Sequence, residues 1–183
     1  MTRPPLATGT ATLAFDTGPL SAFARAGLIG VLKTLTEHDR VVAPEAVIDE
    51  CRRGLHIYPH LQQVLDSEWI ERVVVDGDAL MAYGAIASRL VVGMRNIGEA
   101  EVIAWAKAND AEAVLDDRAA RAIAEVSGVR VRGSLRFVID AINEGHLSRD
   151  MAAGIANELQ AVCRLPFDAG GFLEWADEEG LLV

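Results

Sequence analysis

The chain has 183 residues, of which 51% are hydrophobic and only 5% aromatic. That length predicts one domain with a sizeable core, and the aliphatic composition favours helices packed on a parallel sheet. Asp and Glu number 27 against 17 Lys and Arg, and the resulting net charge of -10 disfavours nonspecific nucleic-acid binding, which depends on neutralising phosphates. A local basic rim, or a metal ion between an acidic pocket and a phosphate, stays compatible with this charge.

The sequence carries no sign of export or of membrane insertion. Its N-terminal residues lack the continuous apolar run of a signal peptide, and no stretch has the length and purity of a membrane span. Neither Cys51 nor Cys163 belongs to a metal-type CxxC pair, so both are expected to be buried, reduced thiols. These features predict a soluble cytoplasmic protein.

The first predicted elements follow a loose leader at residues 1–11. The apolar run at 12–15 predicts a short strand, and Pro19 suits the first position of the helix that follows. Apolar residues then recur at helical spacing, with Gly27 as a break between two short helices. The chain thus begins as a strand followed by a helical pair.

The rest of the chain continues the alternation of strands and helices. The further predicted elements are a strand at 40–44, a helix at 45–54, a short helix at 58–66, a strand at 69–75, helices at 79–90 and 98–109, a strand at 112–117, a helix at 118–128, a strand at 129–133, a helix from Ser134 as N-cap to Gly145, and two helices within 148–183. Short apolar strands that alternate with helices predict an α/β layered fold with a mainly parallel sheet.

Acidic residues stand where the predicted strands end. Asp16 closes the first strand, Asp116 and Asp117 close the strand at 112–117, and Glu99 opens the helix before that strand. Glu50 lies on the helix after the second strand. Because ligands of open parallel sheets bind outside the carboxyl ends of the strands, these acids are candidates for one shared site.

Each acid also has a purely structural explanation. Asp16 and Asp117 can be helix N-caps, Glu99 favours the positive end of its helix, and Glu50 can be a solvated surface residue. The adjacent carboxylates, if about 4 Å apart, repel by roughly 4 kcal/mol at an effective dielectric near 20. A helix N-terminus, a basic neighbour, solvent or a cation can offset this repulsion. A cluster of carboxylates without paired His or Cys favours Mg²⁺ or Mn²⁺ over zinc.

Other catalytic motifs are missing from the sequence or contradicted by it. The chain contains no GxSxG, no GxxxxGK[ST] and no GxGxxG after its first strand. The FDTGP stretch at 15–19 is similar to the DTG signature of aspartic proteases, but those proteins are mostly β and this segment leads directly into helical sequence. A receiver-type phosphoacceptor domain is also disfavoured, because its acidic pair would follow the first strand.

Four segments in a fixed order resemble the PIN-domain ribonucleases, and more narrowly their toxin-like branch. These segments are LAFDTGPL, VVAPEAVIDEC, IGEAEVIAWA and VLDDRAARAIAEVSGVRVRGSLRFVIDAINEGHL. The resemblance covers roughly residues 12–147 and implies a three-layer α/β/α fold there, with 148–183 as a C-terminal helical extension. It implies a Mg²⁺- or Mn²⁺-dependent endoribonuclease that hydrolyses RNA phosphodiester bonds.

The resemblance also implies roles for the acids. Asp16, Glu50, Glu99 and Asp117 match the catalytic acids, and Thr17 matches the hydroxyl residue after the first Asp. The implied metal ligands are Asp16, Glu99, Asp116 and Asp117. Two ambiguities remain, namely whether Glu101 replaces Glu99 as third acid, and which aspartate of the adjacent pair is used.

Partners follow from the same resemblance. Proteins of this branch are commonly toxins paired with an antitoxin, and they often form homodimers. The arginines that could form a basic rim for RNA are Arg118, Arg121, Arg130, Arg132 and Arg136, although surface arginines also simply balance an acidic protein. The alternative function is a catalytically inactive PIN-like module that binds protein or RNA.

Overall fold

The computed structural model describes residues 11–93 and 95–183, so nearly all of the predicted leader lies outside the described residues. Five parallel strands form one sheet in the order β3-β2-β1-β4-β5. The strands are β1 Thr12–Phe15, β2 Arg40–Pro44, β3 Ile70–Val73, β4 Glu112–Val114 and β5 Arg130–Arg132. The predicted strands are therefore confirmed, with β1 and β2 matching to the residue.

The helices also follow the predicted order. They are α1 Thr17–Arg25, α2 Ile29–Leu35, α3 Glu45–Gly54, the 3-10 turn η1 Pro59–Leu61, α4 Gln62–Leu65, α5 Gly77–Leu90, α6 Ile97–Ala108, α7 Arg118–Val126, α8 Ser134–Asn143, α9 Arg149–Val162 and α10 Phe172–Glu178. Gly27 has a φ of 72° and separates the first two helices as predicted. None of the helices in the described part of the chain has the length and apolar character to cross a bilayer.

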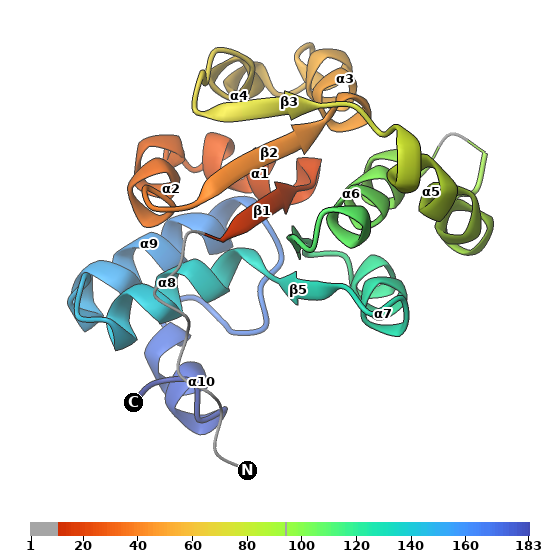
Figure 1. Ribbon diagram of the computed structural model, residues 1–183. Helices are drawn as coiled ribbons and strands as arrows, with labels where there is room; N and C mark the ends of the chain where they lie inside the picture. The colour runs from red at the N-terminus through yellow and green to blue at the C-terminus, as the bar shows by residue number, and fades with distance from the viewer. Residues whose placement is uncertain (1–10, 94) are drawn as a thin grey trace.

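The sheet is the middle layer of a three-layer α/β/α fold, as predicted. From β1 the chain adds β2 and β3 on one side, and it then returns to place β4 and β5 on the other side. Because parallel crossovers are right-handed, these two directions of travel put their helices on opposite faces. Figure 1 shows α5, α6 and α7 together on one side of the strands and α2, α8 and α9 on the other. The order reverses between β1 and β4, which is where α/β sheets place ligands.

Helix α6 forms the centre of one outer layer. Val102, Ile103 and Ala104 are fully buried, and the helix contacts β1, β2 and β4. A helix that is apolar around its circumference must lie inside the protein, which explains why its sequence lacks a polar face. Its first turn, which contains Glu99, is thereby held inside the protein beside the central strands.

On the opposite face, α8 packs beneath β1. The Phe15 and Phe137 rings stack with their centroids 5.6 Å apart and an interplanar angle of 13°. The prediction of Ser134 as the N-cap of this helix is wrong, because Gly133 is the N-cap and the Ser134 hydroxyl donates to Asp116 Oδ2 instead. Pro19 is likewise the third residue of α1 rather than the first, since Asp16 caps the helix two residues earlier than expected.

The C-terminal segment packs onto the rest of the molecule. Helix α9 contacts α1 and α8, and α10 contacts α9. Phe167, Phe172 and Trp175 form an aromatic cluster with ring centroids 5.5 to 6.3 Å apart. The extension therefore lies against the same helical layer as α1, while a domain boundary at residue 147 stays a prediction.

Candidate active site

Asp16 lies at the switch point of the sheet. Its backbone N–H donates to the Val114 carbonyl oxygen at 3.1 Å, which ties the end of β1 to the end of β4. Oδ2 accepts a hydrogen bond from the Gly18 N–H at 3.1 Å and so caps α1. Oδ1 is buried and accepts no hydrogen bond from the described residues. The N-cap role thus accounts for only one of the two carboxylate oxygens.

Glu50 is brought to Asp16 by the first turn of α1 and by Gly98. The Thr17 hydroxyl donates to Glu50 Oε2 at 2.6 Å. A Cβ atom at Gly98 would lie 3.2 Å from Glu50 Oε2 and 3.5 Å from Asp16 Oδ1. Gly98 therefore borders the space between the two carboxylates, where any side chain would intrude. Sequence reasoning missed this glycine, whose signal was its place directly before Glu99 in a helix that otherwise contains no glycine.

Glu99 completes a group of electrostatically coupled acids. Its Oε2 is buried and accepts no hydrogen bond from the rest of the described chain. Burial raises the pKa of Glu99, and the charges of Glu50 and Asp117 raise it further. Burial also raises the pKa of Asp16 to about 8, with further contributions from Glu99 and Glu50. Asp16, Glu50 and Glu99 thus lie within electrostatic reach of one another, and Asp117 lies within reach of Glu99.

The two adjacent aspartates each bind a different helix N-terminus. Asp117 is the N-cap of α7, with Oδ1 accepting the Ala120 N–H at 2.8 Å. Asp116 turns to α8, where Oδ1 accepts the Ser134 N–H at 2.8 Å and Oδ2 accepts the Ser134 hydroxyl at 2.5 Å. Of the offsets considered for their repulsion, helix N-termini are therefore present. Asp116 has both oxygens occupied, whereas Asp117 keeps one for other partners.

Glu101 has a different task from Glu99. Its Oε2 accepts the Ala46 N–H at 3.1 Å, so it satisfies a backbone donor in the first turn of α3. Residues two apart on a helix differ by about 200° in direction, so the two glutamates project to opposite sides. Burial raises the pKa of Glu101, with Asp49 and Glu45 as the acidic neighbours. Among the glutamates of α6, only Glu99 is coupled to Glu50 and Asp117.

The donor set suits a hard divalent cation, but it is not a closed cage. Among the described residues, no three His, Cys, Asp or Glu side chains are grouped closely enough to hold a metal ion as they stand. Asp16 Oδ1 and Glu99 Oε2 are nevertheless buried and receive no hydrogen bond from the part of the chain that the structure describes, which costs free energy in the absence of a ligand. Carboxylate oxygens with water are the ligands that Mg²⁺ and Mn²⁺ take.

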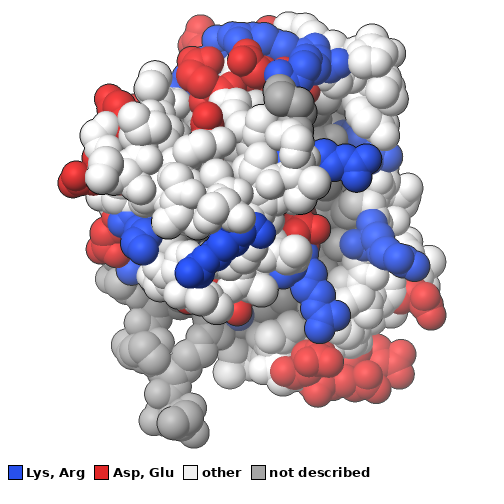
Figure 2. Space-filling view, turned by 90° about the vertical axis from the view of Figure 1, so that its right-hand side faces the viewer, with Lys and Arg blue, Asp and Glu red and all other residues white. Residues whose placement is uncertain are grey.

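Most arginines of the predicted basic rim form ion pairs with acids of the same chain. Three of its arginines bind neighbouring acids, namely Arg130 with Asp110 at 3.0 Å, Arg132 with Glu112 at 3.0 Å and Arg136 with Asp140 at 2.6 Å. On the side of the molecule shown in Figure 2, Lys and Arg form separate patches, some of them beside Asp and Glu, without a continuous stripe. The ion pairs of Arg132 and Arg136 are largely buried beside β5 and α8, whereas the Arg130–Asp110 pair is exposed.

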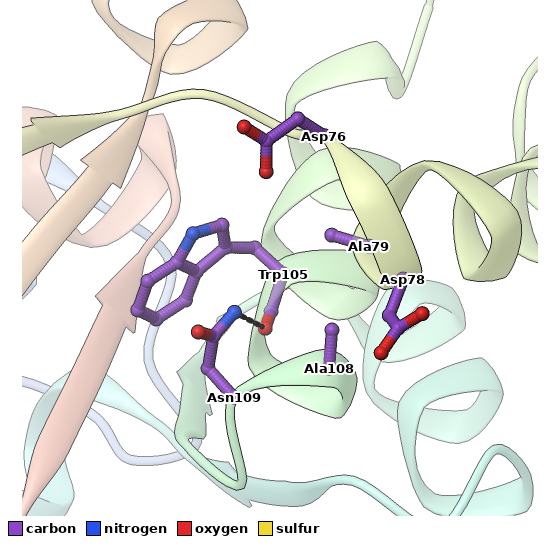
Figure 3. Close-up of a pocket in the computed structure, with 6 residues that line it drawn as sticks. All are labelled: Asp76, Asp78, Ala79, Trp105, Ala108 and Asn109. Atoms are coloured by element: carbon purple, nitrogen blue, oxygen red, sulfur yellow. Dashed lines mark hydrogen bonds between the residues drawn. The ribbon is translucent and has the colours of Figure 1, made fainter.

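One surface hollow lies away from the acids. It has a volume of about 230 Å³ and is lined by Asp76, Asp78, Ala79, Trp105, Ala108 and Asn109, from the start of α5 and the end of α6 (Figure 3). The Asn109 side-chain amide donates to the Trp105 carbonyl oxygen at 2.9 Å. Since α6 rises about 1.5 Å per residue, Trp105 lies roughly 9 Å along the helix from Glu99. The hollow is thus separate from the acidic site.

The two cysteines take no part in a disulfide. Cys51 is fully buried, and burial together with the charges of Glu50 and Asp16 raises the pKa of its thiol to about 12. Cys163 is half-buried. The prediction of a buried thiol is therefore confirmed for Cys51 and holds only in part for Cys163.

Comparison with known proteins places this arrangement in a family. A family model described as a PIN domain matches residues 12–165. The chain belongs to the PIN-domain family. One solved structure with the same fold is VapBC2 from Rickettsia felis bound to a DNA fragment from their promoter, with a TM-score of 0.50 and 12% identity over 67% of this chain and 98% of the other. No curated protein sequence matches this chain. The PIN-domain match includes Asp16, Glu50, Glu99 and Asp117.

Replacing Gly98 by alanine tests whether the space beside it is functional. The new methyl group would stand 3.2 Å from Glu50 Oε2 and 3.5 Å from Asp16 Oδ1, so it should displace whatever binds between them. We expect Mn²⁺ affinity, measured by isothermal titration, to fall about 10-fold or more, as when a residue that orients metal ligands is lost. Gly84→Ala on α5 is the control, because a Cβ there meets no neighbouring atom. Equal Mn²⁺ affinity in both variants would contradict the assignment.

Proposed function

We propose that this PIN-domain protein is a Mg²⁺- or Mn²⁺-dependent endoribonuclease and the toxin of a toxin–antitoxin pair. The observation that carries the proposal is a pair of buried carboxylate oxygens, Asp16 Oδ1 and Glu99 Oε2, that have no hydrogen-bond partner among the described residues. Both belong to one electrostatically coupled acidic group at the switch point of the sheet. Membership of the PIN-domain family supports the proposal. The electrostatic coupling of Glu99 to Asp16, Glu50 and Asp117 supports a shared acidic site.

The residues divide the chemistry among them. Asp16 and Glu99 would hold the cation, and Asp117 would contribute through the oxygen that does not cap α7. When bound, the cation supplies polarisation of the phosphate and activation of a water. Glu50, whose Oε2 is oriented by the Thr17 hydroxyl, is placed to accept a proton from the attacking water. In this scheme Asp116 is a positioning residue, because it fixes the end of β4 to α8 through Ser134.

The direct test uses the purified protein and a mixed pool of RNA. Discrete cleavage products are expected with Mn²⁺ and none with EDTA, and Asp117→Asn should reduce cleavage strongly while keeping its cap to Ala120. A DNA pool of the same length distribution measures selectivity for RNA. Cleavage that persists in EDTA, or equally in Asp117→Asn, would contradict the proposal.

A matched pair of variants separates the two glutamates of α6. Glu99→Gln should abolish Mn²⁺ binding and cleavage with little loss of stability, because it removes a buried charge near other acids. Glu101→Ala should keep the metal site but lose the cap on α3, costing about 1 kcal/mol in the free energy of unfolding. Isothermal titration and thermal denaturation report the two effects. The opposite result would make Glu101 the third acid.

A catalytically inactive RNA- or protein-binding module is the second candidate. It is favoured by the finding that no three acids of the described residues stand together as a ready metal-binding group, and by the net charge of -10. It predicts RNA or protein binding that Mn²⁺ and Asp16→Asn leave unchanged. The cleavage assay above therefore also decides between the two candidates.

The cellular setting is proposed from the family resemblance. We expect a cytoplasmic protein that acts on RNA, forms a homodimer and is neutralised by an antitoxin protein. Sedimentation of the purified chain tests the dimer, and co-expression with the product of a neighbouring reading frame tests the antitoxin.

We also propose residues 12–147 as the nuclease domain and 148–183 as an extension. Expression of residues 12–147 alone tests that boundary.

A further inference from the structure

A second hollow adjoins the acidic site. It has a volume of about 240 Å³ and lies between α1, the end of β4 and the segment after α9. It is lined by Gly18, Ser21, Ala22, Arg25, Asp116, Cys163 and Arg164. Four of these residues are spaced as i, i+3, i+4 and i+7 on α1, so one face of that helix forms a wall. The hollow shares Gly18 with the Asp16 cap, so it lies next to the candidate active site.

Two guanidinium groups converge on this hollow. Among the described residues, neither Arg25 nor Arg164 is part of an ion pair, in contrast to Arg130, Arg132 and Arg136. The Arg25 guanidinium lies over the Tyr58 ring at 4.6 Å from its centroid. Stacking orients the planar group and leaves its N–H donors available for a phosphate. In a chain with an excess of acids, two arginines that line one hollow and form no ion pair with any described residue suggest an external anion.

We propose that Arg25 and Arg164 bind a phosphate of the RNA strand next to the bond that is cleaved, so that the C-terminal extension forms part of the substrate site. The hollow is smaller than the roughly 300–1,000 Å³ of pockets for drug-sized ligands, which suits one phosphate with part of its ribose. Ala22 and Cys163 give the ribose an apolar surface. Asp116 is the one acid of the lining, and both its oxygens already accept from Ser134.

RNA is favoured over a protein partner because of where the hollow lies. An RNA strand whose scissile phosphate meets the acids at the end of β1 can run along the face of α1 that lines the hollow. That face leads from Gly18 in the first turn to Arg25, the last residue of α1, and Arg164 lies beside it. This inference rests on the proposed function for the identity of the ligand, although binding and cleavage can be measured separately.

The experiment measures binding without cleavage. A fluorescent single-stranded RNA is titrated with the full chain in EDTA at several salt concentrations, and affinity is read by anisotropy. Loss of one phosphate contact makes the negative slope of log K against log salt shallower by about 0.7. This corresponds to about 5-fold weaker binding at 0.1 M salt. We expect this change for Arg25→Ala and for Arg164→Ala. Arg89→Ala on α5 is the control, because Arg89 is exposed and does not line the hollow.

A chemical footprint checks the site without substitution of an arginine. Cys163 lines the hollow and is half-buried, whereas Cys51 is fully buried and serves as the internal control. RNA should slow the alkylation of Cys163 in EDTA, and it should leave Cys51 unmodified throughout. Mass spectrometry of the digested protein measures both thiols.

The outcomes separate this proposal from the nuclease assignment. Arginine variants that bind RNA like the wild type, with no protection of Cys163, overturn the pocket whether or not the wild type cleaves RNA. Weakened binding in both variants supports the pocket even if the wild type proves inactive. Normal RNA binding together with loss of a co-purifying protein would make the hollow a protein-binding site and overturn the proposal.

Discussion

Replacing Asp16 by asparagine is expected to abolish RNA cleavage and Mn²⁺ binding while leaving the fold intact. The amide oxygen can still accept the Gly18 N–H, so the cap on α1 survives. The substitution removes the charge of Oδ1, the buried oxygen at the switch point for which residues 11–93 and 95–183 supply no hydrogen-bond donor. Because metal ions supply several kcal/mol of transition-state charge stabilisation, cleavage should fall by roughly 100-fold or more. Rates on a labelled RNA and heats of Mn²⁺ titration measure both losses.

The control for this variant is Asp76→Asn. Asp76 is also an N-cap aspartate, but it is exposed and its side chain makes no capping hydrogen bond to α5. The Asp76→Asn variant should cleave RNA and bind Mn²⁺ like the wild type. If Asp16→Asn behaved like this control, Asp16 would be only a helix cap, and the metal site would have to be sought elsewhere.

The order of elements could be predicted from sequence because the central strands β1, β2 and β4 belong to short apolar runs with clear ends. The runs at 12–15 and 40–44 are both bounded by polar residues or proline, and both strands match to the residue. Helix α6 was predicted at 98–109 and lies at Ile97–Ala108. The spacing of apolar residues along the chain indicates which positions are buried, and this spacing differs between strands and helices.

The directions of individual side chains could not be predicted in the same way. Asp116 and Asp117 are adjacent, so the sequence assigns them the same neighbourhood, yet one binds the start of α8 and the other the start of α7. The difference depends on Ser134, which is 18 residues away. Likewise, what distinguishes Glu101 from Glu99 is the hydrogen bond that Glu101 accepts from Ala46, which lies on another helix. Long-range partners of this kind leave no local pattern.

The arginine rim shows the opposite failure. Arg130 and Arg136 are plausible RNA contacts by position, but each forms an ion pair that the sequence does not reveal, Arg130 with the exposed Asp110 and Arg136 with the buried Asp140. The sequence does not indicate that Arg25 and Arg164 meet, because they are far apart in the chain and neither stands near an acidic motif. Only the packing of α9 against α1 brings them to one hollow.

The stability of the metal-free protein should fall as pH rises, and Mn²⁺ should reverse that fall. Burial raises the pKa of Asp16 from 3.8 to about 8. Between these two values the folded protein holds a proton that the unfolded chain has lost, so the free energy of unfolding decreases with increasing pH. The stabilisation is complete below pH 3.8 and is lost by about pH 8. Burial of Glu99 raises its pKa and acts in the same direction.

Thermal denaturation in EDTA across this pH range measures the effect. A change of 1 kcal/mol shifts the melting temperature by about 2–4 °C in a domain of this size, so a shift of several degrees is expected. Asp16→Asn should flatten the profile and melt higher than the wild type at pH 8, because it cannot ionise. Other titrating groups add their own slopes, which makes the difference between the two proteins the decisive quantity.

Adding Mn²⁺ should stabilise the wild type more at pH 8 than at pH 5, since the cation competes with protons for the same carboxylates. Asp16→Asn should gain little at either pH. A carboxyl that were merely a protonated helix cap would give the same slope in EDTA but no response to Mn²⁺. The response to Mn²⁺ at high pH therefore distinguishes a metal-binding carboxylate from a buried structural one. The raised pKa of Asp16 alone does not make this distinction.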